Sequence, residues 1–401
     1  MASQRRGAIR IAASAFPITP APLLSTVAAP PDHTTAPLFV RPPVGVPSGG
    51  PRLAFLDGLR GLAAIWVLLF HLGAGGQIVT LLALLPAWLD TALIDWGYLG
   101  VAVFFVLSGF VIALSVGDTP VDGHYLRRFV MRRSIRLDLP YWASIAITLA
   151  VLTAKATLRP GAPTPRVGIG NLLAHMVYLQ DLLGLPEINE VYWTLCFEIQ
   201  FYLLFGALLL LSTWSSGDNR TSRARGIVFT GAALVALAWP LFPTLHLRGL
   251  SLTHWYGFLL GALVCWSLTG RMATRWLGLY VALLLGVWWK TREDFTMACI
   301  LTAAVIHTVG TAGRLATALH GRLVQFLGRI SYSLYLLHIP VSGGMFALTA
   351  QVLGDSVLDR AIATSAVFAA NVCVAWLAWR FIEQPSTQLS RRLRLTPTAP
   401  G

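Results

Sequence analysis

Long apolar runs separated by short polar stretches make up most of this chain. Ten of these runs approach the roughly 20 residues that an α-helix needs to cross a bilayer. They lie at residues 54–73, 95–117, 139–158, 191–213, 226–242, 253–269, 275–290, 295–313, 330–352 and 359–382. Each run favours one transmembrane helix, so the pattern predicts an all-α polytopic membrane protein.

Two shorter apolar stretches, 78–89 and 171–185, depart from this pattern because they contain Pro86, His175 and Asp181. Irregular backbone at membrane depth is tolerated only where protein buries it or where it lines a cavity. We therefore expect interfacial or re-entrant segments here instead of further spans.

The two ends of the chain differ from its middle. Residues 1–52 are rich in Pro, Ala, Ser and Thr and show no helical or strand period, which predicts a disordered tail. We expect a transmembrane domain over 53–390 and a short basic tail over 391–401.

Composition supports the membrane assignment. The chain is 56% hydrophobic and only 12% charged, whereas soluble domains carry about 25% charged residues. Its net charge of +13 would suit a nucleic-acid partner, but the arginines gather in short loops between alternate apolar runs. That distribution is typical of cytoplasmic loops. It excludes nucleic acid as a partner and predicts two cytoplasmic termini with an even number of spans.

The cysteines indicate neither a disulfide nor a metal site. All four lie inside apolar runs, without a CxxC pair or the spacing of metal ligands: Cys196, Cys265, Cys299 and Cys373. We expect them to pack as small hydrophobic side chains, and we expect no metal.

The first span, "LDGLRGLAAIWVLLFHLG", carries two residues that are costly in lipid, Arg60 and His71. Eleven positions are close to whole turns at about 3.6 residues per turn, so both side chains share one face, roughly 16 Å apart along the axis. Such residues generally face a bundle interior or a wet cavity, with Arg60 here at the cytoplasmic end. Alternatively, Arg60 extends to lipid headgroups and His71 caps the span.

Glu198 lies in the fourth span, after Trp193. A buried carboxylate needs a partner, because moving an unpaired carboxylate from water into the protein costs roughly several kcal/mol. This span runs inward from the outer surface, so we expect Glu198 at the same depth as His71. A structural hydrogen bond between helices is the alternative.

Two further polar patterns each leave two interpretations open. Arg133 and Arg136 stand three residues apart before the third span. The pair either binds phosphate through its two guanidinium groups or marks a cytoplasmic loop that attracts anionic lipid. Ser331, Tyr335 and His338 form a stripe at helical spacing, which lines a cavity or joins helices.

Taken together in chain order, these motifs resemble membrane acyltransferase family 3, the integral-membrane O-acyltransferases. The resemblance covers about residues 53–390 and rests on these signatures: Arg60-x10-His71, "GVAVFFVLSGFVI", the RxxR of Arg133 and Arg136, "YWTLCFEIQFY", "ISYSLYLLHIP" and "FIEQPS". One departure is Leu139, where the family often has proline; here Pro140 follows it. We expect the stand-alone form, without an appended SGNH-type esterase domain.

The resemblance implies transfer of an acyl group from cytoplasmic acyl-CoA, with acetyl-CoA expected, to a hydroxyl that commonly belongs to a sugar. It implies a bacterial inner membrane and an acceptor such as an envelope glycan, glycolipid or glycosylated metabolite. His71 would be the general base or a transient acyl carrier, and Glu198 would orient it or compensate its charge.

Arg60, Arg133 and Arg136 would then hold the phosphates of CoA at the inner face. Trp193 and the stripe of Ser331, Tyr335 and His338 would line the substrate channel. A transporter or flippase is the main alternative from another class, and a membrane-anchored sensor that binds lipid is a second. Transporters often show inverted repeats, and the sequence shows no internal repeat.

Overall fold

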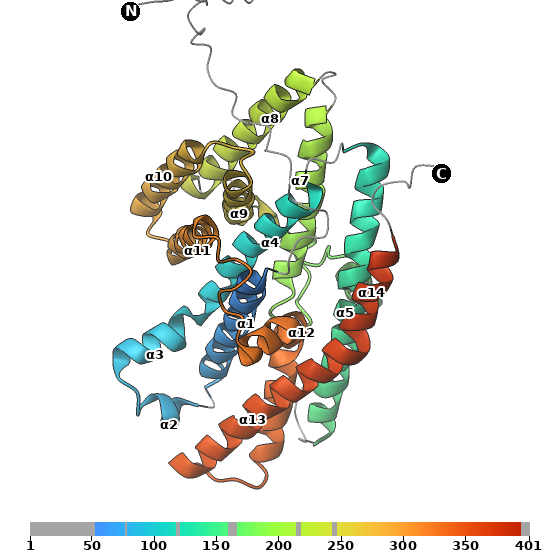
Figure 1. Ribbon diagram of the computed structural model, residues 1–401. Coiled ribbons are helices and arrows are strands. Elements are labelled where there is room, and N and C mark those ends of the chain that lie inside the picture. Colours follow the sequence, from blue (N-terminus) through green and yellow to red (C-terminus); the bar gives the residue numbers. More distant parts are fainter. Residues whose placement is uncertain are drawn as a thin grey trace, which may run out of the picture. The chain divides into compact units, whose positions relative to one another are not determined.

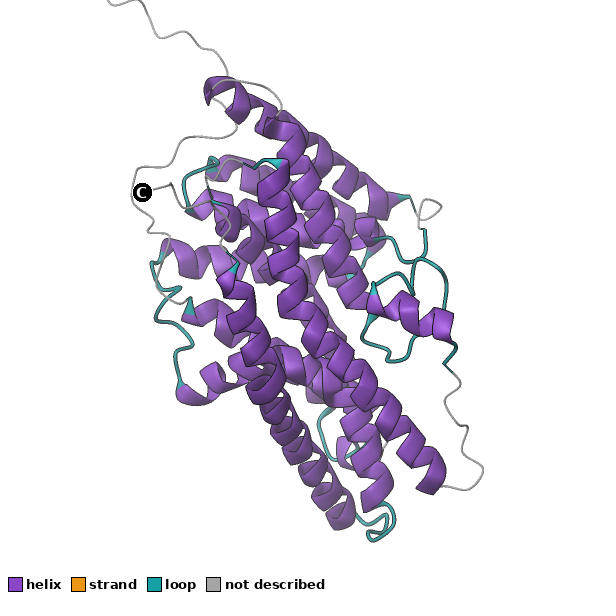
Figure 2. Cartoon of the chain, turned by 90° about the vertical axis from the view of Figure 1, so that its right-hand side faces the viewer, coloured by secondary structure: helices purple, strands orange, loops and turns teal. Residues whose placement is uncertain are grey.

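A computed structural model of the chain describes residues 53–76, 78–117, 121–158, 167–213, 218–242 and 247–393, with the side chains of 158, 213 and 218–223 excepted. The predicted tail over 1–52, and the predicted basic tail beyond residue 393, lie outside these residues. Within them, every regular element is a helix (Figures 1 and 2).

The longer helices follow the ten apolar runs. They are α1 (Ala54–Ala74), α4 (Gly100–Val116), α5 (Gly123–Leu158), α7 (Trp193–Thr213), α8 (Asp218–Ala238), α9 (Trp255–Leu268), α10 (Thr274–Thr291), α11 (Asp294–Thr311), α12 (Arg322–Thr349) and α13 (Val357–Ala378). The short elements are α2 (Val79–Leu82), α3 (Ala87–Leu93), η1 (Asp95–Leu99), α6 (Ile169–Met176), η2 (Trp239–Leu241), η4 (Ser251–His254), η5 (Trp379–Glu383) and α14 (Gln384–Arg392).

Seven segments of the described chain are long and apolar enough to cross a membrane. They are Ala54–Ala74, Ala87–Val116, Gly123–Thr157, Trp193–Ser212, Ala224–Leu241, Asp294–Thr311 and Val357–Arg392. The all-α polytopic membrane fold is therefore confirmed. The count of ten spans and the cytoplasmic placement of both termini stay predictions.

Close backbone approach holds the centre of the bundle together. A Cβ atom on Gly109 of α4 would collide with the carbonyl oxygen of Phe258 in α9, and one on Gly261 of α9 would collide with that of Val106. Without a hydrophobic drive between helices in lipid, such small residues permit the van der Waals contact that holds spans together. The same device joins α1 to α12, where Gly328 lies against the backbone of Asp57.

Two prolines interrupt long helices, and side chains from other segments satisfy the carbonyls that they free. Pro140 in α5 has no N–H for the carbonyl of Arg136, which instead accepts a hydrogen bond of 3.1 Å from Ser386 Oγ of α14. The next carbonyl, of Leu137, accepts one of 3.1 Å from Tyr332 Oη of α12. These bonds fix the wall of α5 that carries the paired arginines.

Pro340 in α12 frees the carbonyl of Leu336 in the same way. The donor is Asn189 Nδ2, at 3.1 Å, from the segment that precedes α7. Asn189 is only 4% exposed, so this donor itself lies inside the protein.

The stretch 171–185 enters the bundle, as its sequence predicts. Trp142 Nε1 of α5 donates to the carbonyl of Met176 at 3.0 Å, and Tyr178 Oη donates to Asp138 Oδ1 at 2.9 Å. Both partners lie within α5, a candidate span, so the loop packs against the bundle through these bonds. Its apolar side chains Leu173, Val177 and Leu183 point away from the bundle and are exposed.

The stretch 78–89 instead forms α2, a turn and the start of α3, which lie at the edge of the bundle in Figure 1, where Trp66 Nε1 of α1 donates to the carbonyl of Ala92 in α3. Its apolar side chains Val79, Leu84 and Trp88 are exposed, which suits the interfacial segment that the sequence predicts.

The packing of α4 on α9 gives a direct test. Gly109→Ala should lower the free energy of unfolding by about 1–3 kcal/mol, because the new methyl group meets backbone that cannot rotate away. Thermal melting of detergent-solubilised protein measures the change. Gly278→Ala in α10 is the control, because its Cβ meets nothing within 4 Å. Equal melting temperatures for the two variants would contradict the close contact.

Candidate active site

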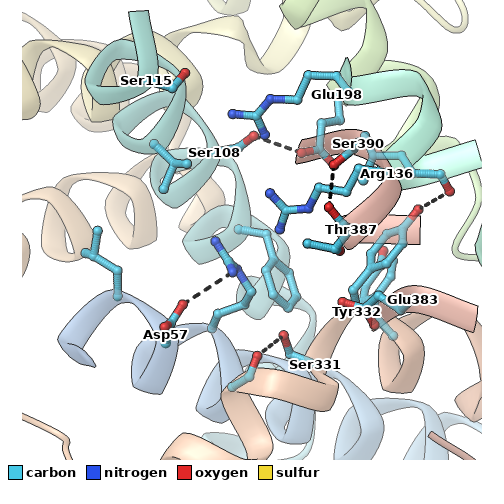
Figure 3. A pocket seen from close by; sticks show the side chains of 18 of the residues that line it. Asp57, Ser108, Ser115, Arg136, Glu198, Ser331, Tyr332, Glu383, Thr387 and Ser390 are labelled. Atoms are coloured by element: carbon cyan, nitrogen blue, oxygen red, sulfur yellow. Dashed lines mark hydrogen bonds and ion pairs between the residues drawn. The ribbon is translucent and has the colours of Figure 1, made fainter. Parts of the chain in front are cut away.

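A cavity of about 830 Å³ lies between α1, α4, α5, α7, α12 and the η5–α14 segment (Figure 3). Its volume is within the range of small-molecule sites, about 300–1,000 Å³. It brings together residues that are more than 300 positions apart in the chain, from Leu53 to Arg391.

Positive charge dominates the lining. Six arginines line the cavity: Arg60, Arg132, Arg133, Arg136, Arg329 and Arg391. Three carboxylates line it as well: Asp57, Glu198 and Glu383. The excess of guanidinium groups inside a bundle of apolar helices makes the cavity suited to a polyanion.

The paired arginines of α5 remain available for such a ligand. Arg133 packs its guanidinium against the rings of Phe129, at 5.6 Å, and Tyr202, at 5.2 Å. Neither Arg133 nor Arg136 forms an ion pair with a carboxylate among the described residues. Arg60 approaches Asp57 at 3.7 Å, a loose contact at the limit of an ion pair.

Glu198 lies inside this cavity, in a network of hydroxyl groups. It accepts hydrogen bonds from Ser108 Oγ of α4, at 2.9 Å, and from Tyr202 Oη, one turn along α7. Because Tyr202 also contacts Arg133, the carboxylate and the guanidinium share one partner. Glu198 thus joins α4 and α7 beside the arginines of α5.

The expected approach of Glu198 to His71 is not seen, and the reason is the starting depth of α7. That expectation placed the start of the fourth span at the outer surface. The structure starts α7 at Trp193, after a re-entrant segment that has already entered the bundle. About one and a half turns further along, Glu198 therefore lies beside Ser108 and close to Arg133, among the arginines.

His71 has a different partner. Its Nδ1 lies 2.9 Å from the carbonyl oxygen of Val67 and 3.2 Å from Nε2 of His338. Neither imidazole is among the residues that line the cavity. The structure therefore unites two residues that the sequence had placed in separate motifs, and it separates both from the arginines.

Tyr335 stands between the cavity and the histidine pair. It lines the cavity, and its ring centroid lies 5.9 Å from that of His338. Its hydroxyl is 2.8 Å from Thr194 Oγ1 of α7, so α12 and α7 close the cavity at this point. Ser331, one turn before Tyr335, also lines the cavity, while its hydroxyl donates to the carbonyl of Gly328.

Trp193 does not line this cavity. Its ring packs edge-on against Phe105, at 6.4 Å, and Phe197, at 5.2 Å, with His254 nearby at 6.3 Å. It supports Phe105, which is itself a lining residue.

Several lining residues were not singled out from the sequence. Glu383 is the clearest, since it ends a π-helical turn, η5, and accepts a hydrogen bond of 2.6 Å from Ser333 Oγ. It is the acidic residue of "FIEQPS", so the motif carried the signal. Ser108 and Tyr332 lie in the motifs "GVAVFFVLSGFVI" and "ISYSLYLLHIP", but their spacing alone gives no indication of a shared cavity.

Among the described residues, no group of three or more metal-binding side chains occurs. The four cysteines are free: Cys196, Cys265 and Cys299 are buried, and Cys373 is exposed.

Comparison with known proteins gives the family. Residues 53–380 match the model of an acyltransferase domain. The chain belongs to this acyltransferase family. No solved structure matches it.

Three curated relatives are similar over most of this chain. The peptidoglycan O-acetyltransferase OatA of Listeria monocytogenes is 25% identical, over 82% of this chain and 55% of its own length. The putative peptidoglycan O-acetyltransferase YrhL of Bacillus subtilis is 26% identical, over 82% and 54%. The acyltransferase MdmB of Streptomyces mycarofaciens is 26% identical, over 87% and 95%. The chain thus spans about half the length of the two peptidoglycan relatives.

The hydrogen bond from α14 to the kinked part of α5 gives a second test. Ser386→Ala should destabilise the protein by about 1–3 kcal/mol, because it leaves the carbonyl of Arg136 unpaired in a buried site. It should also weaken anion binding, since the same turn holds the Arg136 side chain. Thermal melting and binding of CoA to solubilised protein measure the two effects.

Ser390→Ala is the matched control. Its hydroxyl also lines the cavity but bonds only to the carbonyl of Thr387 in its own helix, at 2.8 Å. If both serine variants melt at the same temperature, α14 does not support the kink.

Proposed function

We propose that this protein is an acyl-CoA-dependent O-acyltransferase, which moves an acyl group, acetyl being expected, to a hydroxyl of a sugar-bearing acceptor. The observation that carries the proposal is the arginine-lined cavity on one side of Tyr335, with the His71–His338 pair on the other. Membership of the acyltransferase family supports the reaction class.

The cavity is the donor site in this proposal. CoA carries a pyrophosphate and a 3′-phosphate, and forked guanidinium groups bind phosphate oxygens two at a time. Arg133 and Arg136 present such groups from one face of α5, and Arg60 faces them from α1. The polyanion would supply the anionic partner that Arg133 and Arg136 do not find among the described carboxylates.

His71 is the proposed general base. It would take the proton of the acceptor hydroxyl while the oxygen attacks the thioester carbonyl; the C–S bond then breaks and CoA leaves as a thiol. Transient transfer of the acyl group to His71 itself is the alternative path. In both paths the pantetheine arm must pass Tyr335 and Thr194, whose hydroxyl groups meet at 2.8 Å.

Glu198 has a different proposed role from the one that the sequence favoured. Within the cavity it balances part of the arginine charge and fixes the hydroxyls of Ser108 and Tyr202. It would thereby keep Arg133 in place for the donor, and it would not act on His71.

The acceptor class and the location rest on the relatives and on topology. Two relatives are named as peptidoglycan O-acetyltransferases, which favours a hydroxyl on a carbohydrate. Basic loops predict that the arginine side faces the cytoplasm, where acyl-CoA is made, in a bacterial inner membrane. His71, about 16 Å further along α1, would then be open to an acceptor from the other side.

The phosphate site is tested by exchanging arginine for lysine, which keeps the charge but loses the fork. Arg133→Lys and Arg136→Lys should each weaken CoA binding about tenfold, the equivalent of one bidentate contact at roughly 1.4 kcal/mol. Isothermal titration with CoA on solubilised protein measures the affinity.

Arg127→Lys is the matched control, because Arg127 lies on the same helix, is exposed and does not line the cavity. If all three variants bind CoA as the parent does, the basic stretch serves topology alone.

The reaction itself is tested with sealed vesicles and labelled acetyl-CoA. Inside-out vesicles, which expose the cytoplasmic face, should transfer label to acceptor glycan enclosed in their lumen or release it as acetate, and right-side-out vesicles should not. His71→Ala should lower this turnover by about 10² or more, the usual cost of losing a general base.

CoA affinity should survive His71→Ala, because His71 does not line the arginine cavity. Parental turnover in a folded His71→Ala protein would remove His71 from the mechanism. Equal labelling from both vesicle types would contradict the proposed sidedness.

A further inference from the structure

The two imidazoles that lie behind Tyr335 face each other directly. His71 Nδ1 and His338 Nε2 are 3.2 Å apart, and the ring centroids are 4.8 Å apart at an interplanar angle of 63°. His338 is only 1% exposed, whereas His71 is partly exposed. The pair therefore has a buried member and an accessible one.

The surroundings of His338 determine which of its nitrogens carries hydrogen. Its Nδ1 lies 2.8 Å from the carbonyl oxygen of Tyr335 and 3.2 Å from that of Leu334. Carbonyl oxygens only accept, so Nδ1 must donate. In the neutral ring, Nε2 of His338 then holds a lone pair and faces His71 as an acceptor.

The same reasoning fixes His71. Its Nδ1 lies between two acceptors, the carbonyl oxygen of Val67 at 2.9 Å and Nε2 of His338 at 3.2 Å. Nδ1 of His71 must therefore carry the hydrogen. Nε2 of His71 is left with the lone pair, which is the atom that a base uses.

A doubly protonated His338 does not fit these contacts. Its Nε2 would then donate to His71, so Nδ1 of His71 would have to accept while also facing the lone pairs of Val67 O. A positive charge on a ring that is 1% exposed, surrounded by carbonyls and a second imidazole, would also lack the pairing that a buried charge needs.

We propose that His338 is the positioning residue of His71. It holds the Nδ1–H tautomer and the ring orientation that leave Nε2 free, and it accepts the Nδ1–H hydrogen bond when His71 takes up the hydroxyl proton. This inference rests on the proposed function. In it, the acceptor oxygen bonds to the acyl carbon, the C–S bond breaks, and the proton on Nε2 passes to the departing thiolate. His338 neither gains nor loses a proton, a part that a carboxylate plays in hydrolase triads.

Two amide variants separate this role from a merely structural one. The Gln side chain of His338→Gln reaches the position of the imidazole Nε2, so its oxygen can accept from His71. The Asn side chain of His338→Asn reaches only the position of Nδ1, so it can donate to the carbonyls of Leu334 and Tyr335 but cannot contact His71.

Positioning predicts that His338→Gln retains most of the parental kcat, and that His338→Asn loses about tenfold or more, because the His71 ring then keeps only the carbonyl of Val67 and is no longer held in its orientation. KM for acetyl-CoA should stay unchanged in both, since the arginines lie on the other side of Tyr335. A structural role predicts the opposite order. If Asn matches or exceeds Gln in kcat, the proposal is overturned.

A second measurement does not depend on acyl transfer. Full-length protein with ¹⁵N-labelled histidine in nanodiscs reports the protonated nitrogen of each ring by NMR, and the spectrum of His71→Gln assigns the His71 signals. An Nδ1–H tautomer on His71, with Nε2 unprotonated, is the expected result; an Nε2–H tautomer would overturn the inference. If the parent transfers no acyl group, the proposed function fails, and this spectrum still decides the geometry of the pair.

Discussion

Hydrogen bonds to carbonyls that proline sets free hold the site in position. In a bilayer no water can satisfy these groups, so protein must supply the donors. Ser386 and Tyr332 supply them at the kink of α5, and Asn189 supplies one in α12. These bonds tie α14 and α12 to α5, which carries the paired arginines. They also tie the re-entrant segment to α12, which carries Ser331, Tyr335 and His338.

The kinks also explain the division of the site. The bond from Asn189 draws the chain before α7 into the bundle, so that α7 starts beside α12. Thr194 then reaches Tyr335, and the two hydroxyl groups close the cavity on the side that faces the histidines. Without a re-entrant segment at this place, α7 would begin at the surface, and Glu198 would lie near His71 instead of near Arg133.

Periodicity and charge in the sequence predicted the helices, but they did not predict the depth at which α7 begins in the bundle. The ten apolar runs each correspond to a helix, because a span must be long, apolar and internally hydrogen-bonded. Arg60, Arg133 and Arg136 converge as expected, since all three were placed near one boundary. The predicted position of Glu198 was wrong because a hydropathy pattern shows where an apolar run begins in the sequence. It does not show how far the preceding loop has already entered the helix bundle. The pairing of His71 with His338 depends on how α1 packs along α12 through Gly328, which no local pattern encodes.

The separation of arginines from histidines has a physical reason. A general base becomes positively charged when it takes a proton, and guanidinium groups at short range in a medium of low dielectric would oppose that charge. The proposed donor binding would need those same guanidinium groups. Three turns of α1 separate Arg60 from His71. Tyr335 and Phe104, which pack in a T-shaped contact, lie between the arginines and the histidine pair. On the histidine side the hydrogen-bond partners of His71 Nδ1 are a carbonyl oxygen and a second, buried imidazole, both acceptors, and the nearest charge that acts on His71 is the carboxylate of Glu190. The chain therefore places its positive charge where phosphate would bind and leaves a neutral, oriented ring where the proposed proton transfer would occur.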